Sequence, residues 1–284
     1  MSTAIVLSGG ANLGAMQVGM LRALAEHGVA PDLIVGTSAG ALNAAFIAER
    51  GLTTAAVDEL AQIWRSLRAR DVFPPDPKYL FSAVRGRSPS LFSDFGLRKL
   101  IDRHVNLTVL EDARIPLIVV ATDLLTGGEV DLGWGPAADA VLASSAIPGL
   151  LPPVTWRGRT LVDGGVADNT SLAPAIMAGA ETVYVLPTGY RCAPAEVPDD
   201  AADIVLHATT LLVQKRLIRD IEQYSGAADL IVLPSPCPLD ISPRDFSRAD
   251  ELIERAYREA VSQLAVDGGL RARPATQLAL QPRR

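Results

Sequence analysis

The chain has 284 residues, of which 49% are hydrophobic and 20% charged, which is enough for one large domain or two small ones with a real core. The net charge of −6, without a basic cluster in the body of the chain, excludes nucleic acid as an expected partner, and the two cysteines lack metal-ligand spacing. The first residues lead directly into an apolar strand, so we expect a cytoplasmic protein without a signal peptide or a membrane span.

Strand-like and helical patterns alternate along the chain. In chain order we expect strand 4–7, helix 14–26, strand 33–35, helix 39–49, helix 55–67, strand 115–121, strand 129–132, strand 183–186, helix 201–224, strand 230–233 and helix 248–266. The run at 115–121 is apolar throughout, as in a strand whose two faces are both covered by helices. This order favours a single three-layer α/β/α domain over residues 1–270, with a mainly parallel central sheet and a C-terminal tail at 271–284.

The segment 73–95 interrupts this rhythm. It contains four prolines and an exposed-looking Tyr79-Leu80-Phe81. Two interpretations stay open: a mobile flap over an apolar site, and a surface insertion with no role.

The segment Gly36-Thr37-Ser38-Ala39-Gly40 lies between an expected strand and an alanine-rich helix. A serine at such a junction sits on a sharp turn that holds its hydroxyl clear of the backbone, and the flanking glycines avoid collisions with the strand and the helix. The N-terminus of the helix would also favour an oxyanion next to this hydroxyl. Ser38 is therefore a candidate nucleophile, although an ordinary strand-to-helix turn could also contain serine.

A second glycine-containing segment, from Gly9 to Gly14, follows the first strand and opens the first helix. Small residues there let backbone N–H groups point at an anion or a polarised carbonyl. A dinucleotide-binding loop is the competing interpretation, but it needs glycine at the third position, where Ala11 stands, and an acidic residue after the second strand, where Gly36 stands. We therefore expect no cofactor.

The base that would activate Ser38 is harder to identify. The chain has three histidines, namely His27, His104 and His207. Of these, His207 has the sequence order of an α/β-hydrolase triad, but it lies inside the long helix 201–224 rather than on a loop.

Asp163 is the better candidate base, because Leu161-Val162 leads as a strand into Asp163-Gly164-Gly165. Asp is a weak base, so it needs a water-poor site and a direct hydrogen bond to the serine. The same triplet recurs at Asp267-Gly268-Gly269, but there it follows a helix and indicates an ordinary helix end.

Four ordered segments together resemble the patatin-like phospholipases, over roughly residues 1–190. They are Gly9–Gly14, Gly36–Gly40, Ala143–Gly149 followed by Pro152-Pro153-Val154, and Asp163–Gly165. The resemblance implies a Ser-Asp dyad that cleaves acyl esters, typically of lipids, through an acyl-enzyme.

By position, the resemblance makes Ser38 the nucleophile and Asp163 the base. The roles that it implies for the remaining motif residues are an oxyanion hole at Gly9, Gly10 and Ala11, and support of the motifs by Gly14, Gly36, Gly40, Gly164 and Gly165. Ser144 and Ser145 are expected to be structural.

One residue departs from the family pattern: Leu13 stands where members usually carry a basic side chain. Its lack of charge puts a preference for anionic head groups in doubt and leaves neutral esters, lysolipids and thioesters open.

The expected partner is thus a lipid or other acyl ester, with transient contact to a membrane surface as a further option. Two other functions stay open. An acyltransferase or thioesterase would use the same dyad, and a non-catalytic member would bind lipid or a partner protein without needing Ser38.

Overall fold

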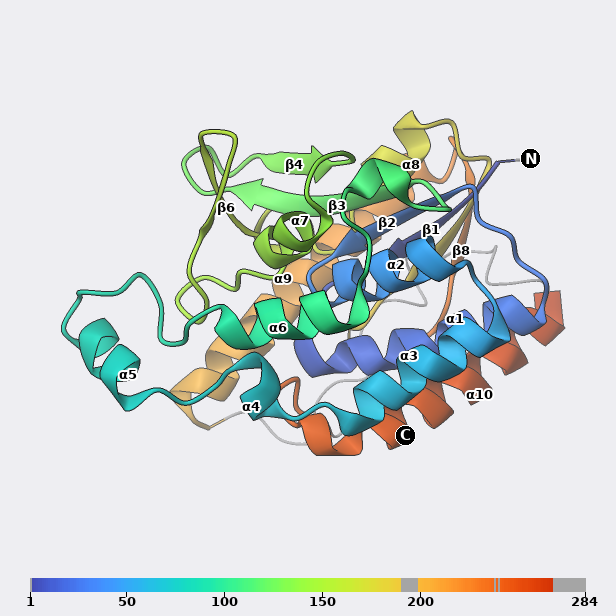
Figure 1. Ribbon diagram of the computed structural model, residues 1–284. Helices are drawn as coiled ribbons and strands as arrows, with labels where there is room; N and C mark the ends of the chain where they lie inside the picture. The colour runs from blue at the N-terminus through green and yellow to red at the C-terminus, as the bar shows by residue number, and fades with distance from the viewer. Residues whose placement is uncertain (1, 190–198, 238, 240, 268–284) are drawn as a thin grey trace.

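The computed structural model describes residues 2–189, 199–237, 239 and 241–267 (Figure 1). The helices are α1 (Ala15–Glu26), α2 (Ala39–Arg50), α3 (Thr54–Ser66), α4 (Ala69–Val72), α5 (Pro77–Val84), α6 (Phe95–His104), α7 (Ala137–Ser144), α8 (Ala173–Met177), α9 (Ala201–Tyr224) and α10 (Ala249–Asp267). The strands are β1 (Thr3–Leu7), β2 (Leu33–Thr37), β3 (Leu117–Asp123), β4 (Glu129–Leu132), β5 (Val154–Trp156), β6 (Arg159–Asp163), β7 (Thr182–Leu186) and β8 (Asp229–Val232).

One sheet carries all of these strands, in the order β5-β6-β3-β2-β1-β7-β8, with β4 also paired to β3. The five strands β3, β2, β1, β7 and β8 run parallel. The strands β4 and β6 pair with β3 in the antiparallel direction, and so does β5 with β6. The expected α/β fold with a mainly parallel sheet is thus confirmed, with an antiparallel portion beyond β3.

Helices cover both faces of the sheet, because alternate strand residues point to opposite faces. On one face, Ile5 and Leu7 of β1 belong to a large core that they share with α1, α2, α3, α6, α7 and α10. On the other face, Ala4 and Val6 pack in a smaller core with α8 and α9. These are the three layers that the alternating pattern predicts (Figure 1).

Several elements lie outside what hydrophobic periodicity predicts. The pattern does not predict α6, α7, α8 or β5, and the expected helix 14–26 is preceded by a 3-10 turn over Ala11–Gly14. The expected tail at 271–284, together with Gly268 and Gly269, lies outside the described residues. Among the residues that are described, no helix is both long enough and apolar enough to cross a bilayer.

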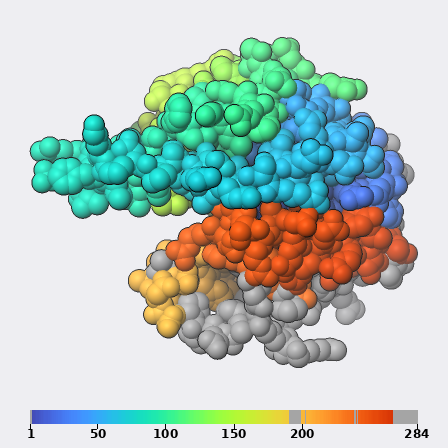
Figure 2. Space-filling view, turned by 60° about the horizontal axis from the view of Figure 1, so that its bottom comes forward, coloured from blue at the N-terminus to red at the C-terminus, as the bar shows by residue number. Residues whose placement is uncertain are grey.

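Segment 73–95 leaves the body of the molecule and returns to it, with α5 at its far end (Figure 1). It projects away from the body in the space-filling view (Figure 2). We call residues 73–95 the arm. No residue of α5 is buried, so the helix is not part of either core.

Candidate active site

Ser38 occupies a strained turn between β2 and α2. Its φ of 54° and ψ of −122° are unfavourable for a residue with a side chain, and such strain is typical of a nucleophile on a sharp strand-to-helix turn. A Cβ on Gly40 would lie 2.4 Å from the carbonyl oxygen of Leu7, and one on Gly36 would lie 2.6 Å from the carbonyl oxygen of Gly40. The glycines are therefore required for the helix to approach β1 and β2 so closely.

Strand β3 brings Ser38 and Asp163 together across 125 positions of sequence. Thr37, the last residue of β2, pairs with Val120, and Asp163, the last residue of β6, pairs with the adjacent Ala121. The hydroxyl of Ser38 donates a hydrogen bond of 2.6 Å to Oδ2 of Asp163. The two residues that the sequence singles out are thus in direct contact.

The second carboxylate oxygen of Asp163 is also held, since Oδ1 accepts a 2.8 Å hydrogen bond from the N–H of Gly165. The main chain of Asp163 is fixed as well: its N–H donates to the carbonyl of Ala146 at 3.0 Å, and its carbonyl accepts from the Thr122 hydroxyl at 2.8 Å. The carboxylate is thus locked in one orientation toward the serine.

Burial controls the charge of Asp163, which is 7% exposed beside a Ser38 that is 6% exposed. Burial raises the pKa of the Asp163 carboxyl to about 6, and the hydrogen bonds from Ser38 and Gly165 oppose this rise. A carboxylate with a pKa near 6 is a stronger base than a solvated aspartate and is still mostly ionised at neutral pH.

Ser144 supports the turn without touching the Ser38 hydroxyl. Its Oγ donates to the carbonyl of Val120 at 2.5 Å and accepts from the N–H of Ser38 at 2.8 Å. It therefore ties the backbone of Ser38 to β3, which is a structural role. Ser145, which follows α7, lines the pocket described below.

The glycine loop lies next to Ser38, and its backbone N–H groups differ in what they do. The sequence predicts that the N–H of Gly9 takes part in an oxyanion hole. In the structure this N–H donates a 3.0 Å hydrogen bond to the carbonyl of Asn169, so it is already engaged. The N–H groups of Gly10 and Ala11 have no acceptor within the described part of the chain. These two remain as candidate donors to an oxyanion.

Two side chains that sequence reasoning missed hold the loop at Gly9. Asn169 donates from Nδ2 to the carbonyl of Gly9 at 3.0 Å, and the hydroxyl of Thr188 donates to the same oxygen. Thr188 packs so closely that a Cβ on Gly10 would lie 2.1 Å from its Oγ1. Asn169 stands six residues after Asp163, and this position is the one feature of the sequence that could have drawn attention to it. Thr188 follows β7 and belongs to no recognisable motif.

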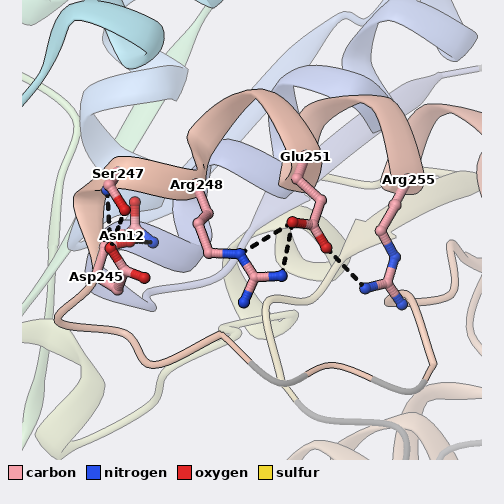
Figure 3. A network of polar contacts seen from close by, with 6 residues as sticks. All are labelled: Asn12, Asp245, Ser247, Arg248, Glu251 and Arg255. Atoms are coloured by element: carbon pink, nitrogen blue, oxygen red, sulfur yellow. Dashed lines mark hydrogen bonds and ion pairs between the residues drawn. The ribbon is translucent and has the colours of Figure 1, made fainter.

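Asn12 anchors the other side of the loop to a segment more than 230 positions away (Figure 3). Its N–H donates to the carbonyl of Pro243 at 3.2 Å, and its Nδ2 donates to the carbonyl of Asp245 at 2.5 Å. The Asp245 carboxylate accepts from the N–H and the hydroxyl of Ser247, which holds this segment at the start of α10. The C-terminal part of the chain therefore positions the loop.

A buried polar chain fixes the end of the loop at Gly14. Asn43 of α2 donates to the carbonyl of Gly14 at 3.0 Å and to Oε1 of Gln17 at 2.9 Å, and it accepts from the indole of Trp64 at 2.8 Å. Gln17 in turn donates to the carbonyl of Ser8 at 2.8 Å. Since all these groups are buried, each hydrogen bond constrains the loop more strongly than it would in water.

An apolar pocket opens to solvent beside Ser38, with a cavity volume of about 50 Å³. Its lining consists of Ala11, Ser38, Ala39, Leu42, Trp64, Leu67, Val72, Phe73, Leu97, Leu100, Ser145, Ile147, Leu151 and Phe246. Apart from the two serines and the indole N–H, these side chains are apolar. Such a lining suits a hydrocarbon chain whose reacting end reaches Ser38.

None of the three histidines forms a hydrogen bond with Ser38 or Asp163. The ring of His27 contacts the carbonyl of Ala23 at 2.8 Å at the end of α1, His104 ends α6, and His207 lies within α9. The arrangement therefore gives no support to a histidine triad.

Leu13, the departure from the family pattern, is 3% exposed and packs in the larger core. Among the described residues, there is no group of three or more His, Cys, Asp or Glu side chains that could hold a metal ion.

Comparison with known proteins places these features in a family. The sequence model described as "Patatin-like phospholipase" matches residues 5–176. An uncharacterized NTE family protein of Mycobacterium tuberculosis is 33% identical over 198 residues, which are 68% of this chain and 51% of that protein. "Lysophospholipase NTE1" of Mycosarcoma maydis is 29% identical over 196 residues, which are 66% of this chain and 10% of that protein.

Among solved structures, human GIVD cytosolic phospholipase A2 has a TM-score of 0.48 and 12% sequence identity, with 99% of this chain and 60% of that chain covered. The chain spans about half the length of the mycobacterial relative and a smaller share of the fungal one. Because the family model matches more than half of the chain and includes both Ser38 and Asp163, the chain belongs to the patatin-like phospholipase family.

Proposed function

We propose that this protein is a serine acyl hydrolase that cleaves carboxylic esters of lipids or lysolipids through an acyl-enzyme on Ser38. The observation that carries this proposal is the 2.6 Å hydrogen bond from the Ser38 hydroxyl to the buried Asp163 carboxylate. The relatives support the substrate class, since one of them is named a lysophospholipase.

In the first half of the reaction, Oγ of Ser38 attacks the ester carbonyl carbon while its proton passes to Oδ2 of Asp163. The carbonyl oxygen becomes an oxyanion, which the free N–H groups of Gly10 and Ala11 stabilise. The tetrahedral intermediate then breaks the bond to the leaving oxygen. Asp163 returns the proton to that oxygen, so an alcohol or lysolipid leaves and the acyl group stays on Ser38.

In the second half, Asp163 takes a proton from a water molecule, whose oxygen attacks the acyl carbonyl. The intermediate expels Oγ of Ser38, which regains the proton from Asp163, and the fatty acid leaves. The same residues therefore serve as base and acid in turn, and no histidine is needed.

The pocket suggests which part of the substrate is bound most firmly. Its wall next to Ser38 is apolar, with Leu42, Leu97 and Leu100 among its side chains, so it fits an acyl chain rather than a charged head group. The buried Leu13 adds no positive charge near the site, which favours neutral esters and zwitterionic lysolipids.

A fluorophosphonate probe tests the proposal, because it reacts with a serine that is both activated and next to an oxyanion hole. We expect one adduct, located by peptide mass on Ser38, that is absent from Ser38→Ala and strongly slowed in Asp163→Asn. Ser145→Ala is the matched control, since Ser145 lines the same pocket but has no base, and it should keep its label. Label on Ser145, or none on the folded wild type, would contradict the mechanism.

Ester hydrolysis then tests the role of the pocket. We expect turnover of p-nitrophenyl esters to rise from acetate to longer acyl chains, and to fall by about 10³-fold in Asp163→Asn. A profile that is flat or favours acetate would remove the acyl-chain role. Transfer of the acyl group to added alcohols in preference to water would instead identify an acyltransferase.

A further inference from the structure

The arm concentrates exposed apolar side chains. Thirteen large hydrophobic residues are exposed in the described part of the chain, and five of them lie between positions 80 and 95. They are Leu80 at 46%, Phe81 at 58%, Val84 at 76%, Leu91 at 38% and Phe95 at 66% exposed. A patch of this density on a soluble surface indicates an interaction site rather than ordinary scatter.

Three of these side chains share one face of α5. Positions 80 and 84 are four residues apart and positions 81 and 84 are three apart, so Leu80, Phe81 and Val84 lie next to one another on the helix. Asp76 caps the N-terminus of α5 by accepting from the N–H groups of the first turn, so the helix is locally well formed. In the space-filling view the arm stands away from the body of the molecule, where this face can reach another surface (Figure 2).

The arm carries a small net positive charge, opposite in sign to that of the whole chain. Residues 73–95 contain three basic residues, Lys78, Arg85 and Arg87, and two acidic ones, Asp76 and Asp94, for a net charge of +1, whereas the chain carries −6. The two carboxylates stand near the ends of the arm, on either side of the basic stretch. None of the three cations forms an ion pair with any described residue. Arg85 instead stacks on Phe81, 4.0 Å from the ring centre, so a cation borders the apolar face.

The two ends of the arm lie at the rim of the pocket. Phe73, at its start, lines the pocket and packs against Phe92, with 5.5 Å between the ring centres. On the return path, the N–H groups of Leu91 and Phe92 donate to the carbonyls of Gly149 and Leu150, next to the pocket residue Leu151. No residue between 74 and 96 lines the pocket itself, so in this structure the arm extends beside the opening and does not close over it as a flap.

We propose that the arm docks this protein on an anionic lipid surface, with Leu80, Phe81 and Val84 inserted among the acyl chains and the basic residues at the level of the head groups. An anionic bilayer matches both features of the arm. Its acyl chains can take up the apolar side chains, and its negatively charged head groups can contact the basic ones. Because the ends of the arm lie at the rim of the pocket, docking through the arm would bring this rim close to the membrane surface. The proposal rests on the proposed function in one respect: the pocket that it serves is taken to accept a lipid acyl chain.

Vesicle flotation tests docking without relying on catalysis. The Ser38→Ala protein, which leaves the lipid intact, is floated with vesicles of phosphatidylcholine alone and of phosphatidylcholine with phosphatidylglycerol. We expect binding to the anionic vesicles, weaker binding to the neutral ones, and loss of binding as salt is raised. Equal binding to both kinds of vesicle at all salt concentrations would overturn the electrostatic part of the proposal.

The arm variant Phe81→Ser/Val84→Ser should lower the share of floated protein by about tenfold. The matched control is Leu125→Ser/Met177→Ser, which removes side chains that are 88% and 85% exposed but lie outside the arm. It should float like its parent. Equal loss in both variants, or no loss in the arm variant, overturns the proposal.

Two further readouts separate the explanations. In an otherwise wild-type chain, both double variants should hydrolyse a water-soluble short-chain ester at the wild-type rate, which shows that they fold. A protein that hydrolyses this ester but floats with no vesicle refutes docking and leaves the function intact. If the Ser38→Ala protein floats but the folded wild type takes no fluorophosphonate label, the proposed function alone is refuted. If sedimentation shows a dimer that Phe81→Ser/Val84→Ser dissociates, and no vesicle is bound, the arm contacts a second copy and the proposal fails.

Discussion

Replacement of Asp163 by asparagine should stabilise the protein while it removes activity. The pKa of this buried carboxyl is about 6, against about 3.8 for an unburied one, so the ionised form is less favourable in the folded chain than in the unfolded chain. Folding therefore loses stability as pH rises from about 4 to about 6, and the loss is complete above pH 7. A pKa difference of about 2 between the folded and the unfolded chain corresponds to about 3 kcal/mol of unfolding free energy.

Asparagine fits the same hydrogen bonds without the charge. Its Oδ1 can accept from the N–H of Gly165, and its Nδ2 can donate to the Ser38 hydroxyl, which then turns its own proton elsewhere. At pH 8 we expect the Asp163→Asn protein to be more stable by up to about 3 kcal/mol, or roughly 5 °C in Tm for a chain of this size. Near pH 4 the difference should fall below about 1 kcal/mol.

Chemical unfolding at pH 8 and pH 4 measures this difference directly. Ser38→Ala is the matched control, because it is equally inactive but keeps the buried charge and removes its best donor, so it should gain no stability. The reasoning would be refuted if Asp163→Asn were no more stable than the wild type at pH 8. A stability gain that is the same at both pH values would refute it too, since burial of charge would then not be the cause.

Other outcomes follow from the same geometry. The kcat/KM for a neutral ester should fall about tenfold for each pH unit below about 6, as Asp163 takes up its proton, and a profile flat down to pH 4.5 would exclude this carboxyl as the base. Ser144→Ala should cost about 1–3 kcal/mol in unfolding free energy and also lower kcat, because the N–H of Ser38 and the carbonyl of Val120 lose their buried partner; Ser145→Ala is the control and should be close to wild type. Gly40→Ala should prevent folding, seen as insoluble protein on expression, because its Cβ would lie 2.4 Å from the Leu7 carbonyl, whereas Gly51→Ala, where no atom lies within 4 Å, should stay soluble at a smaller cost.

Much of the site could be predicted from sequence because its chemistry depends on short motifs. The glycines around Ser38 and the strand that leads into Asp163 are local features. That the two meet is not a local feature, because it depends on the antiparallel pairing of β6 with β3, which places Asp163 opposite Ala121. The positions of most strands also follow from apolar runs, and the short strand at 129–132 has the bounds that its pattern predicts.

The supports of the glycine loop could not be predicted in the same way. The loop is held by residues from distant segments, namely Asn169, Thr188 and the carbonyls of 243–245. These hydrogen bonds involve main-chain carbonyls, and any residue type has such a carbonyl, so the sequence shows no pattern that would predict them. The hydrogen bond from the N–H of Gly9 to the carbonyl of Asn169 could not be predicted for the same reason, because no motif marks this acceptor. The helices α6 and α7 escape prediction because their apolar stretches are short and border loops.

The place of β1 in the sheet has a consequence for how the chain can be divided. This strand carries the glycine loop at its end and is paired on one side with β2 and on the other with β7. The family match ends at residue 176, before β7 begins at Thr182. A fragment cut at that boundary would leave β1 as a bare sheet edge, open to pairing with other chains, and would also lose the 243–245 segment that holds Asn12. An expression fragment designed on the matched residues alone should therefore aggregate, even though it contains both Ser38 and Asp163.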